Sequence, residues 1–169
     1  SAEPEAHQAA SPRRAIIGAI MTTAKERIEA DLKSAMKERD SARVGTLRML
    51  LAAIKNRAIE TGEEIDDDEL IAQVRKQIKQ REDSVRQYRE GGREQLAAKE
   101  EQEIAFLEPY MPEQVGDEEI RAAIEEYVAA EGLEGPRSMG PVMKAMMARF
   151  GASADGATIS RVAREVLGG

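Results

Sequence analysis

Five basic side chains gather near the end of a chain that is acidic overall. The 169 residues carry a formal net charge of -7, yet residues 135–169 hold only Asp155 and Glu165 as acidic groups. Guanidinium and ammonium groups in such a cluster can bind phosphates through charge-assisted hydrogen bonds. The candidate phosphate-binding residues are Arg137, Lys144, Arg149, Arg161 and Arg164.

The segment GASADG at 151–156 separates two helical patterns and adds a feature that suits anions. Small residues leave the backbone accessible, and the N–H groups that begin the next helix can meet a phosphate. We therefore expect an anion-binding turn formed by Gly151, Ser153 and Gly156. An ordinary structural role is also open, in which Gly151 ends one helix and Asp155 caps the next.

The charged and methionine-rich segments also have structural interpretations. Residues 111–134 hold Arg121 against eight acidic groups, so the five cations could balance this neighbouring helix instead of a ligand. A second basic zone from Arg75 to Arg93 is interrupted by acidic residues, which favours a salt-bridged exposed helix. The methionines at 139–147 have helical spacing and are interpreted mainly as core, with a flexible groove for a partner helix as the alternative.

Signatures of catalysis and metal binding are sparse. The chain has no cysteine and one histidine, His7, which excludes thiolate chemistry and a triad built from this chain alone. We assign no catalytic residue, metal or cofactor. No apolar run is long enough to span a membrane, so we expect no membrane partner, and the lack of cysteine fits a reducing compartment. From this we expect a cytoplasmic protein.

Apolar residues recur with helical spacing along most of the chain, and no segment alternates with the period of a strand. The pattern predicts an all-α fold with helices over 23–39, 41–62, 66–91, 93–107, 117–128, 138–150 and 155–167. In the second helix a heptad-like seam could pack within the chain or against another chain, and we favour a monomer. The seam consists of Val44, Leu47, Leu51, Ile54 and Ala58.

Two prolines, Pro109 and Pro112, interrupt the helical pattern and suggest a domain boundary near 108–116. We predict a flexible N-terminal extension over 1–20 and an antiparallel helical N-terminal domain over 21–110. A small three-helix C-terminal domain over 111–169 follows.

Several separated motifs resemble those of the GatB/YqeY family of small bacterial proteins, in the same order and at similar spacing. The resemblance covers about residue 21 to the end. Its motifs are GTLRMLLAAIKN at 45–56, QIKQREDSVRQYREGGREQLAAKEEQEI at 77–104, YMPEQ at 110–114, MGPVMKAMM at 139–147, ADG at 154–156 and ISRVAREVL at 159–167.

The resemblance implies an all-α, two-domain protein whose C-terminal domain is similar to the tail of the B subunit of the tRNA-dependent amidotransferase. That tail helps to hold tRNA, which makes Lys144, Arg161 and Arg164 the closest matches for tRNA-backbone contacts. The family is also labelled with carbon–nitrogen ligase activity that uses glutamine as amido donor. The chain has neither the cradle domain of the B subunit nor an amidase nucleophile, so we expect no catalysis by the chain alone.

Three hypotheses follow from the residues and the resemblance together. The first is an accessory protein that binds tRNA or associates with the amidotransferase or other translation-related proteins. The second is a helical adaptor whose long N-terminal helices dock another protein. The third is a glutamine-dependent amide-transfer enzyme, as the family label implies.

Overall fold

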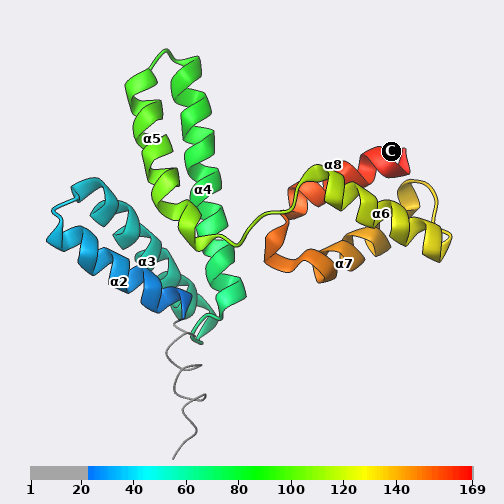
Figure 1. Cartoon of the computed structure of the whole chain (residues 1–169), viewed down its shortest axis with the longest axis horizontal. Helices are drawn as coiled ribbons and strands as arrows, with labels where there is room; N and C mark the ends of the chain where they lie inside the picture. The colour runs from blue at the N-terminus through cyan, green and yellow to red at the C-terminus, as the bar shows by residue number, and fades with distance from the viewer. Residues whose placement is uncertain (1–22, 169) are drawn as a thin grey trace, which may run out of the picture. The chain divides into compact units, whose positions relative to one another are not determined.

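The computed structural model describes residues 23–168, and this range is built from helices (Figure 1). Seven α-helices and three 3-10 turns occur in it, and no strand is found between its ends, so the predicted all-α fold is confirmed. The α-helices are α2 Ala24–Lys37, α3 Ser41–Thr61, α4 Asp67–Glu90, α5 Glu94–Leu107, α6 Asp117–Glu131, α7 Met139–Phe150 and α8 Gly156–Leu167. The 3-10 turns are η1 Glu108–Tyr110, η2 Pro136–Ser138 and η3 Gly151–Ser153. The extension predicted for 1–20 lies outside the described residues.

Local capping signals begin and end the helices close to the predicted positions. Thr23 accepts the N–H of Glu26 at 3.2 Å before α2, and Asp40 accepts the N–H of Arg43 at 3.2 Å before α3. Gly62 ends α3 with a φ of 75°, a left-handed conformation that glycine adopts without steric cost. No helix in the range 23–168 is long and apolar enough to cross a membrane.

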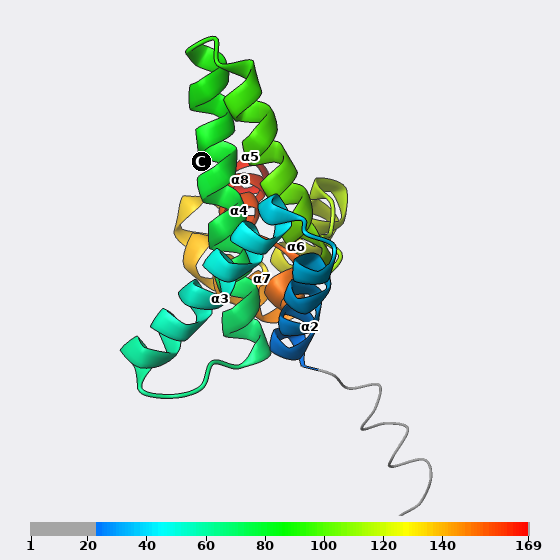
Figure 2. The same ribbon diagram turned by 90° about the vertical axis from the view of Figure 1, so that its left-hand side faces the viewer.

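Contacts divide the chain into two compact units, residues 1–70 and 71–169. In the first unit α2 and α3 pack against each other as an antiparallel pair (Figures 1 and 2). The buried face of α3 carries Leu47, Leu50 and Ile54. Leu47 and Ile54 of the predicted seam are thus buried as expected, whereas its other members, Val44, Leu51 and Ala58, are half-buried.

In the second unit α4 and α5 form an antiparallel hairpin (Figures 1 and 2). Gly92, with a φ of 70°, allows the sharp turn, which the N–H of Arg93 closes by donating to the carbonyl oxygen of Tyr88 at 2.7 Å. Across the hairpin, Nε of Arg81 donates to Oε2 of Glu103 at 3.2 Å. The Arg81 side chain is 6% exposed, so this ion pair joins the two helices away from solvent.

The helices α6, α7 and α8 surround an apolar core of their own. Each helix contributes one face to it, and the core residues are Ile120, Ala123, Ile124, Val142, Met146, Ala154, Ile159, Val162, Ala163 and Leu167. We call these three helices, with η2 and η3, the C-terminal bundle. The boundary expected near residue 110 stays a prediction, because contacts place residues 71–169 in a single unit.

Candidate nucleic-acid interface

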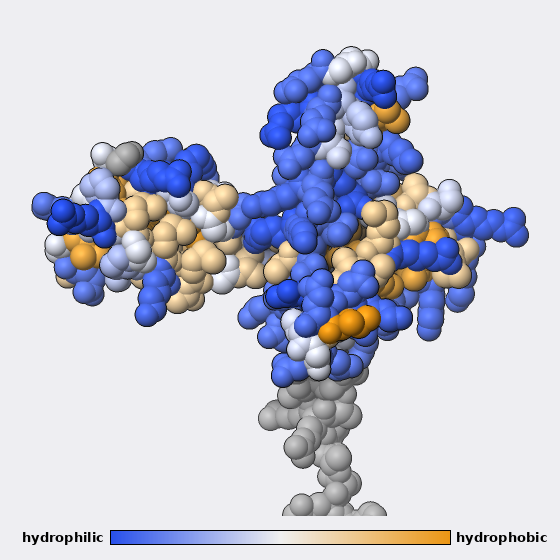
Figure 3. All heavy atoms as spheres, turned by 180° about the vertical axis from the view of Figure 1, so that it is seen from behind, coloured by the Kyte–Doolittle hydropathy of each residue, from blue (hydrophilic) through white to orange (hydrophobic). Residues whose placement is uncertain are grey.

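The helical periodicity of the C-terminal bundle turns its basic side chains outward. In α8 the core positions include Ile159 and Val162, which leaves Arg161 and Arg164 on the surface. All candidate phosphate-binding residues are exposed, namely Arg137, Lys144, Arg149, Arg161 and Arg164. In Figure 3, hydrophilic side chains border paler apolar surface on the face of this bundle that is turned to the viewer.

Two of the five cations are held by acidic partners. Nη2 of Arg161 donates to Oδ2 of Asp117 at 2.6 Å, and Nη1 of Arg149 lies 3.7 Å from Oε2 of Glu126. The hydrogen bond to Asp117 is the main reason why the pKa of Arg161 is raised. Asp117 and Glu126 lie on α6, and Arg161 also lies 3.4 Å from Glu165 of its own helix. For Arg149 and Arg161 the structure therefore supports the interpretation that they balance acidic side chains, mainly those of α6.

The other three cations, Arg137, Lys144 and Arg164, form no ion pair or side-chain hydrogen bond with the residues between 23 and 168. Arg164 follows Arg161 by three positions, yet only Arg161 faces an acidic partner. A cation without an acidic partner can bind a phosphate without first breaking an internal ion pair. These three residues are therefore the strongest part of the predicted site, and we call them the unpaired cations.

Several polar groups of the turn at 151–156 form hydrogen bonds within the protein. The hydroxyl of Ser153 donates to the carbonyl oxygen of Phe150 at 2.6 Å, and its own carbonyl accepts the N–H of Val115 at 2.9 Å. Gly151 ends α7, its N–H donating to the carbonyl of Met147. The anion-binding role of Gly151, Ser153 and Gly156 stays a prediction, and the structural role of this turn is directly visible.

A carboxylate already stands at the N-terminus of α8. Oδ1 of Asp155 accepts the N–H of Ala157 at 3.3 Å, and Oδ2 lies 2.8 Å from Nζ of Lys79. Burial alone would raise the pKa of Asp155, but the hydrogen bonds from Lys79 and Ala157 outweigh it, and the net pKa is lowered. A negatively charged Asp155 opposes a second anion at the same helix end.

The basic zone of α4 follows the salt-bridged interpretation, with one contact that the sequence did not indicate. Arg81 pairs with Glu103, and Arg89 with Glu94 and Glu101. Nη2 of Arg75 donates to the carbonyl oxygen of Ala152 at 2.7 Å, which joins α4 to the turn before α8. Spacing could not reveal this contact, because the two residues are 77 positions apart.

A cleft of about 470 Å³ borders this contact. Its walls include the connector that follows α5, and they carry two cations and four carboxylates, so negative charge is in excess. The lining residues are Arg75, Ile78, Lys79, Glu82, Glu108, Met111, Pro112, Glu113, Gln114 and Asp155.

A larger groove of about 710 Å³ lies in the first unit. Its floor is apolar and its rim is charged, with an excess of carboxylates. The floor consists of Leu51, Ile54, Ala58, Ile65 and Leu70, and the charged rim of Lys25, Glu29, Lys55, Glu64, Asp66 and Asp67.

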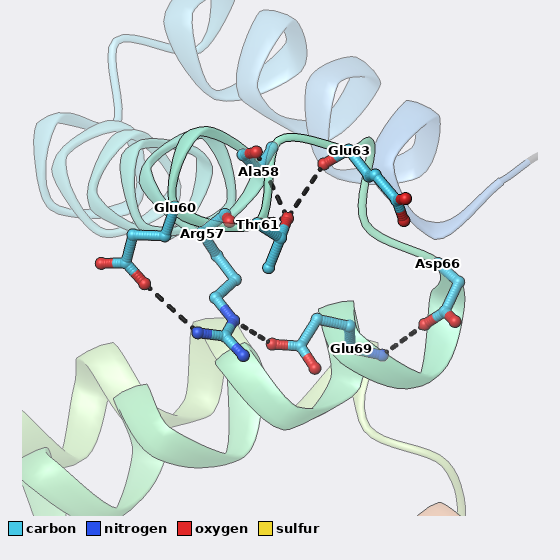
Figure 4. A network of polar contacts seen from close by, with 7 residues as sticks. All are labelled: Arg57, Ala58, Glu60, Thr61, Glu63, Asp66 and Glu69. Carbon is cyan, nitrogen blue, oxygen red and sulfur yellow. Dashed lines mark hydrogen bonds and ion pairs between the residues drawn. The ribbon is translucent and has the colours of Figure 1, made fainter.

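Polar contacts hold the acidic segment that forms one side of this groove (Figure 4). Nε of Arg57 donates to Oε1 of Glu69 at 2.6 Å, a bond that is the main cause of the raised pKa of Arg57. The hydroxyl of Thr61 lies 3.2 Å from the carbonyl oxygen of Glu63, and Asp66 accepts the N–H of Glu69 at 2.8 Å. The segment is therefore held by Arg57 and Thr61 of α3 and by its own Asp66.

Six hydroxyls of the described range donate to nearby backbone or to Glu38, and not to a basic side chain, namely those of Ser34, Thr46, Thr61, Ser84, Ser138 and Ser153. Ser138, for example, donates to the carbonyl oxygen of Glu134 at 3.0 Å. Within residues 23–168, His, Asp and Glu form no group of three that could hold a metal ion. The amide-transfer hypothesis stays a prediction, which a glutaminase assay of the purified chain would test.

The chain is similar to known proteins along most of its length. A family model described as Yqey-like protein matches residues 25–167. A protein of Pyrenophora tritici-repentis named "Altered inheritance of mitochondria protein 41, mitochondrial" is 36% identical over 147 residues, which cover 84% of this chain and 80% of that protein.

Two yeast proteins of the same name match over a shorter range. The Vanderwaltozyma polyspora protein is 38% identical over 85 residues, covering 50% of this chain and 46% of its own length. The Saccharomyces cerevisiae (strain YJM789) protein is 35% identical over 91 residues, covering 53% and 49%. The aligned region thus spans about half the length of these two relatives.

The expectation of a cytoplasmic protein is wrong, because these relatives carry the word mitochondrial in their names. The expectation rested on the absence of cysteine and of a long apolar run. Both features are common to proteins of several compartments, so composition could not distinguish among them.

Proposed function

Because the chain belongs to the YqeY-like family, we propose that it is an accessory protein that binds the phosphate backbone of tRNA through its C-terminal bundle. The proposal rests on Arg137, Lys144 and Arg164, which are free to bind a phosphate. They are exposed and lack acidic partners in the described chain, while Arg149 and Arg161 on the same bundle are paired. The resemblance to the amidotransferase tail supports tRNA as the proposed ligand, and the amidotransferase or other translation-related proteins as the proposed partners.

Salt-dependent binding tests this function. We would measure the affinity of the full chain for labelled bulk tRNA by fluorescence anisotropy over a salt series. Each phosphate contact adds about 0.7–0.9 to the slope of log affinity against log salt. The triple variant Arg137→Glu, Lys144→Glu, Arg164→Glu should therefore bind weakly, with a slope smaller by about 2–3.

A matched variant separates a local site from a general effect of charge. Lys33→Glu, Lys37→Glu and Arg48→Glu change the net charge equally, at exposed positions of the first unit. This control should bind tRNA with nearly the wild-type slope. Equal losses in the two triple variants, or a wild-type affinity that does not respond to salt, would refute the proposed site.

The groove of the first unit favours a second candidate function, which is docking of a partner helix. Its apolar floor can accept the apolar face of a helix, and its rim carries more carboxylates than lysines. Glu29, Glu64 and Asp67 have no ion-pair partner in the part of the chain that the structure describes. The matching partner is a basic amphipathic helix.

Two synthetic peptides would test this docking function. An amphipathic leucine–lysine peptide should bind the full chain, and a leucine–glutamate peptide of equal length should not. Glu29→Lys with Glu64→Lys should weaken binding of the basic peptide, whereas Glu125→Lys with Glu131→Lys, exposed on α6, should not. Equal effects of both pairs would show that only net charge attracts the peptide.

A further inference from the structure

A stripe of methionines runs along the side of α7 that borders α8. Met139, Met143 and Met147 follow one another at intervals of four residues, so they share one helical face. Met139 and Met143 are half-buried and Met147 is 47% exposed, whereas the neighbouring Met146 is 1% exposed and belongs to the core. The core interpretation therefore fits Met146 fully and Met139 and Met143 in part, since both pack against the core, while Met147 leaves apolar surface open to solvent.

The edge of α8 beside this stripe begins with two small residues, Gly156 and Ser160. Sδ of Met147 lies 3.6 Å from the position that a Cβ on Gly156 would take. The short turn η3 joins α7 and α8, and the two helices pack in opposite directions (Figure 1). Register then places Ser160 near Met143 and Arg164 near the start of α7.

The unpaired cations border the same stripe. Lys144 follows Met143 directly and is exposed. Arg137 lies in η2, which packs against both α7 and α8, at the end of the stripe where register also places Arg164. Positive charge without internal partners thus lies alongside a narrow apolar surface.

We propose that this stripe is a subsite for unpaired nucleobases of RNA, with the unpaired cations binding the phosphates on either side. The inference rests on the proposed function and adds the form of RNA that is preferred. A duplex presents phosphates and riboses while its base faces are stacked inside, so a methionine stripe gains little from it. An unpaired base offers a flat, polarisable face, which the flexible thioether of methionine can contact.

The dimensions of the stripe agree with this ligand. Methionines four residues apart are separated by about 6 Å along the helix axis, so successive side chains can meet successive nucleotides of an extended strand. A docked protein helix would need a wider apolar surface. On the α8 side the stripe meets Gly156 and Ser160, which supply almost none.

Three RNA probes and one substitution test the subsite. The probes are an unstructured 12-mer, the same 12-mer paired with its complement, and a 12-mer with abasic sugars, each measured with the full chain at one salt concentration. Wild type should bind the unstructured strand more tightly than the other two. Met147→Ser should lower affinity for that strand by about two- to tenfold and leave the duplex and abasic affinities unchanged.

The matched control is Met49→Ser, since Met49 is also an exposed helical methionine, 58% exposed, but lies in the first unit. It should not change any of the three affinities. Because Met147 is exposed, its replacement should also leave the thermal midpoint of the bundle close to wild type.

The outcomes distinguish this inference from the proposed function. Salt-dependent binding of all three probes with equal affinity would overturn the base subsite and leave backbone binding intact. No binding of any probe at low salt would overturn both. An acidic amphipathic peptide that binds in a Met147-dependent way, without a preference for unpaired RNA, would overturn the subsite in favour of a protein ligand.

Discussion

At the scale of single residues, Asp155 shows how one carboxylate serves two structural roles. It caps α8 through the N–H of Ala157 and pairs with Lys79 of α4. These hydrogen bonds place the pKa of Asp155 below its ordinary value of 3.8, although burial acts in the opposite direction. A group whose pKa is lowered on folding stabilises the folded state when it is ionised.

Asp155→Asn isolates the contribution of the ion pair, because asparagine can still cap a helix. At pH 7 we expect the free energy of unfolding to fall by about 0.2–1 kcal/mol, the range of partly exposed ion pairs. The stabilisation is present above the ordinary pKa of 3.8 and is lost as the pH falls through the lowered pKa of the folded state. Urea unfolding at pH 7 and at about pH 3 would therefore show the difference between variant and wild type shrinking in acid.

A double-mutant cycle provides the control for this pair. In a Lys79→Gln background, Asp155→Asn should have little further effect at pH 7, because the partner is already absent. Additive losses from the two substitutions would show that the contact between Asp155 and Lys79 contributes nothing measurable.

At the scale of secondary-structure elements, two glycines have opposite roles, one inside α3 and one at its C-cap. Gly62 ends the helix in a left-handed conformation, with a φ of 75°, whereas Gly45 lies inside the helix. A Cβ added at either position would have no atom within 4 Å, so packing does not separate them. Backbone conformation alone decides the effect of a side chain at each site.

We expect alanine to change stability in opposite directions at these two glycines. Gly62→Ala should destabilise by about 1–2 kcal/mol, because a side chain is disfavoured in the left-handed region. Gly45→Ala should stabilise by about 0.5–1 kcal/mol, because alanine restricts the unfolded chain and favours the helix interior. Urea midpoints of the two variants, measured beside wild type, would test this, and a shift in the same direction for both would contradict it.

The same helix ends explain which structural features could be predicted from sequence. The caps Thr23, Asp40 and Gly62 act within four residues of their targets, so their patterns are visible in the chain. Whether a cation has an acidic partner in the folded chain cannot be predicted from such local patterns. Arg161 and Arg164 are alike in sequence, but Asp117, 44 positions away, engages only Arg161. Five candidate cations could thus be named, while the three without partners emerged only from tertiary contacts.

At the scale of the whole molecule, charge is distributed unevenly between acidic and basic surfaces. The chain has a net charge of -7, which repels nucleic acid at long range, especially at low ionic strength. Under the proposed function, the unpaired cations would therefore act locally on the C-terminal bundle, alongside the acidic helix α6. This arrangement predicts that the affinity for RNA is modest. It also predicts that this affinity depends more on the positions of the basic residues than on the net charge.

The organisation of the second unit leads to a prediction about fragments. The C-terminal bundle has a core of its own, including Ile124, Val142 and Ile159. Arg75 and Lys79 bond to its turn from α4, within the larger unit 71–169. We therefore expect residues 111–169 to fold cooperatively alone, and residues 71–169 to hold the same bundle more stably by about 1–3 kcal/mol. Urea unfolding followed by circular dichroism would compare the two fragments.

The comparison of fragments decides between two positions for the domain boundary. A cooperative transition in 111–169 would place a folding boundary near residue 110, with the contacts from α4 as an added stabilisation. If 111–169 shows no cooperative transition while 71–169 does, the bundle needs Arg75 and Lys79 in order to fold. The folding boundary would then lie at residue 70. Lys79→Gln within 71–169 would then lower the unfolding midpoint, because it removes the ion pair with Asp155 on which that dependence rests.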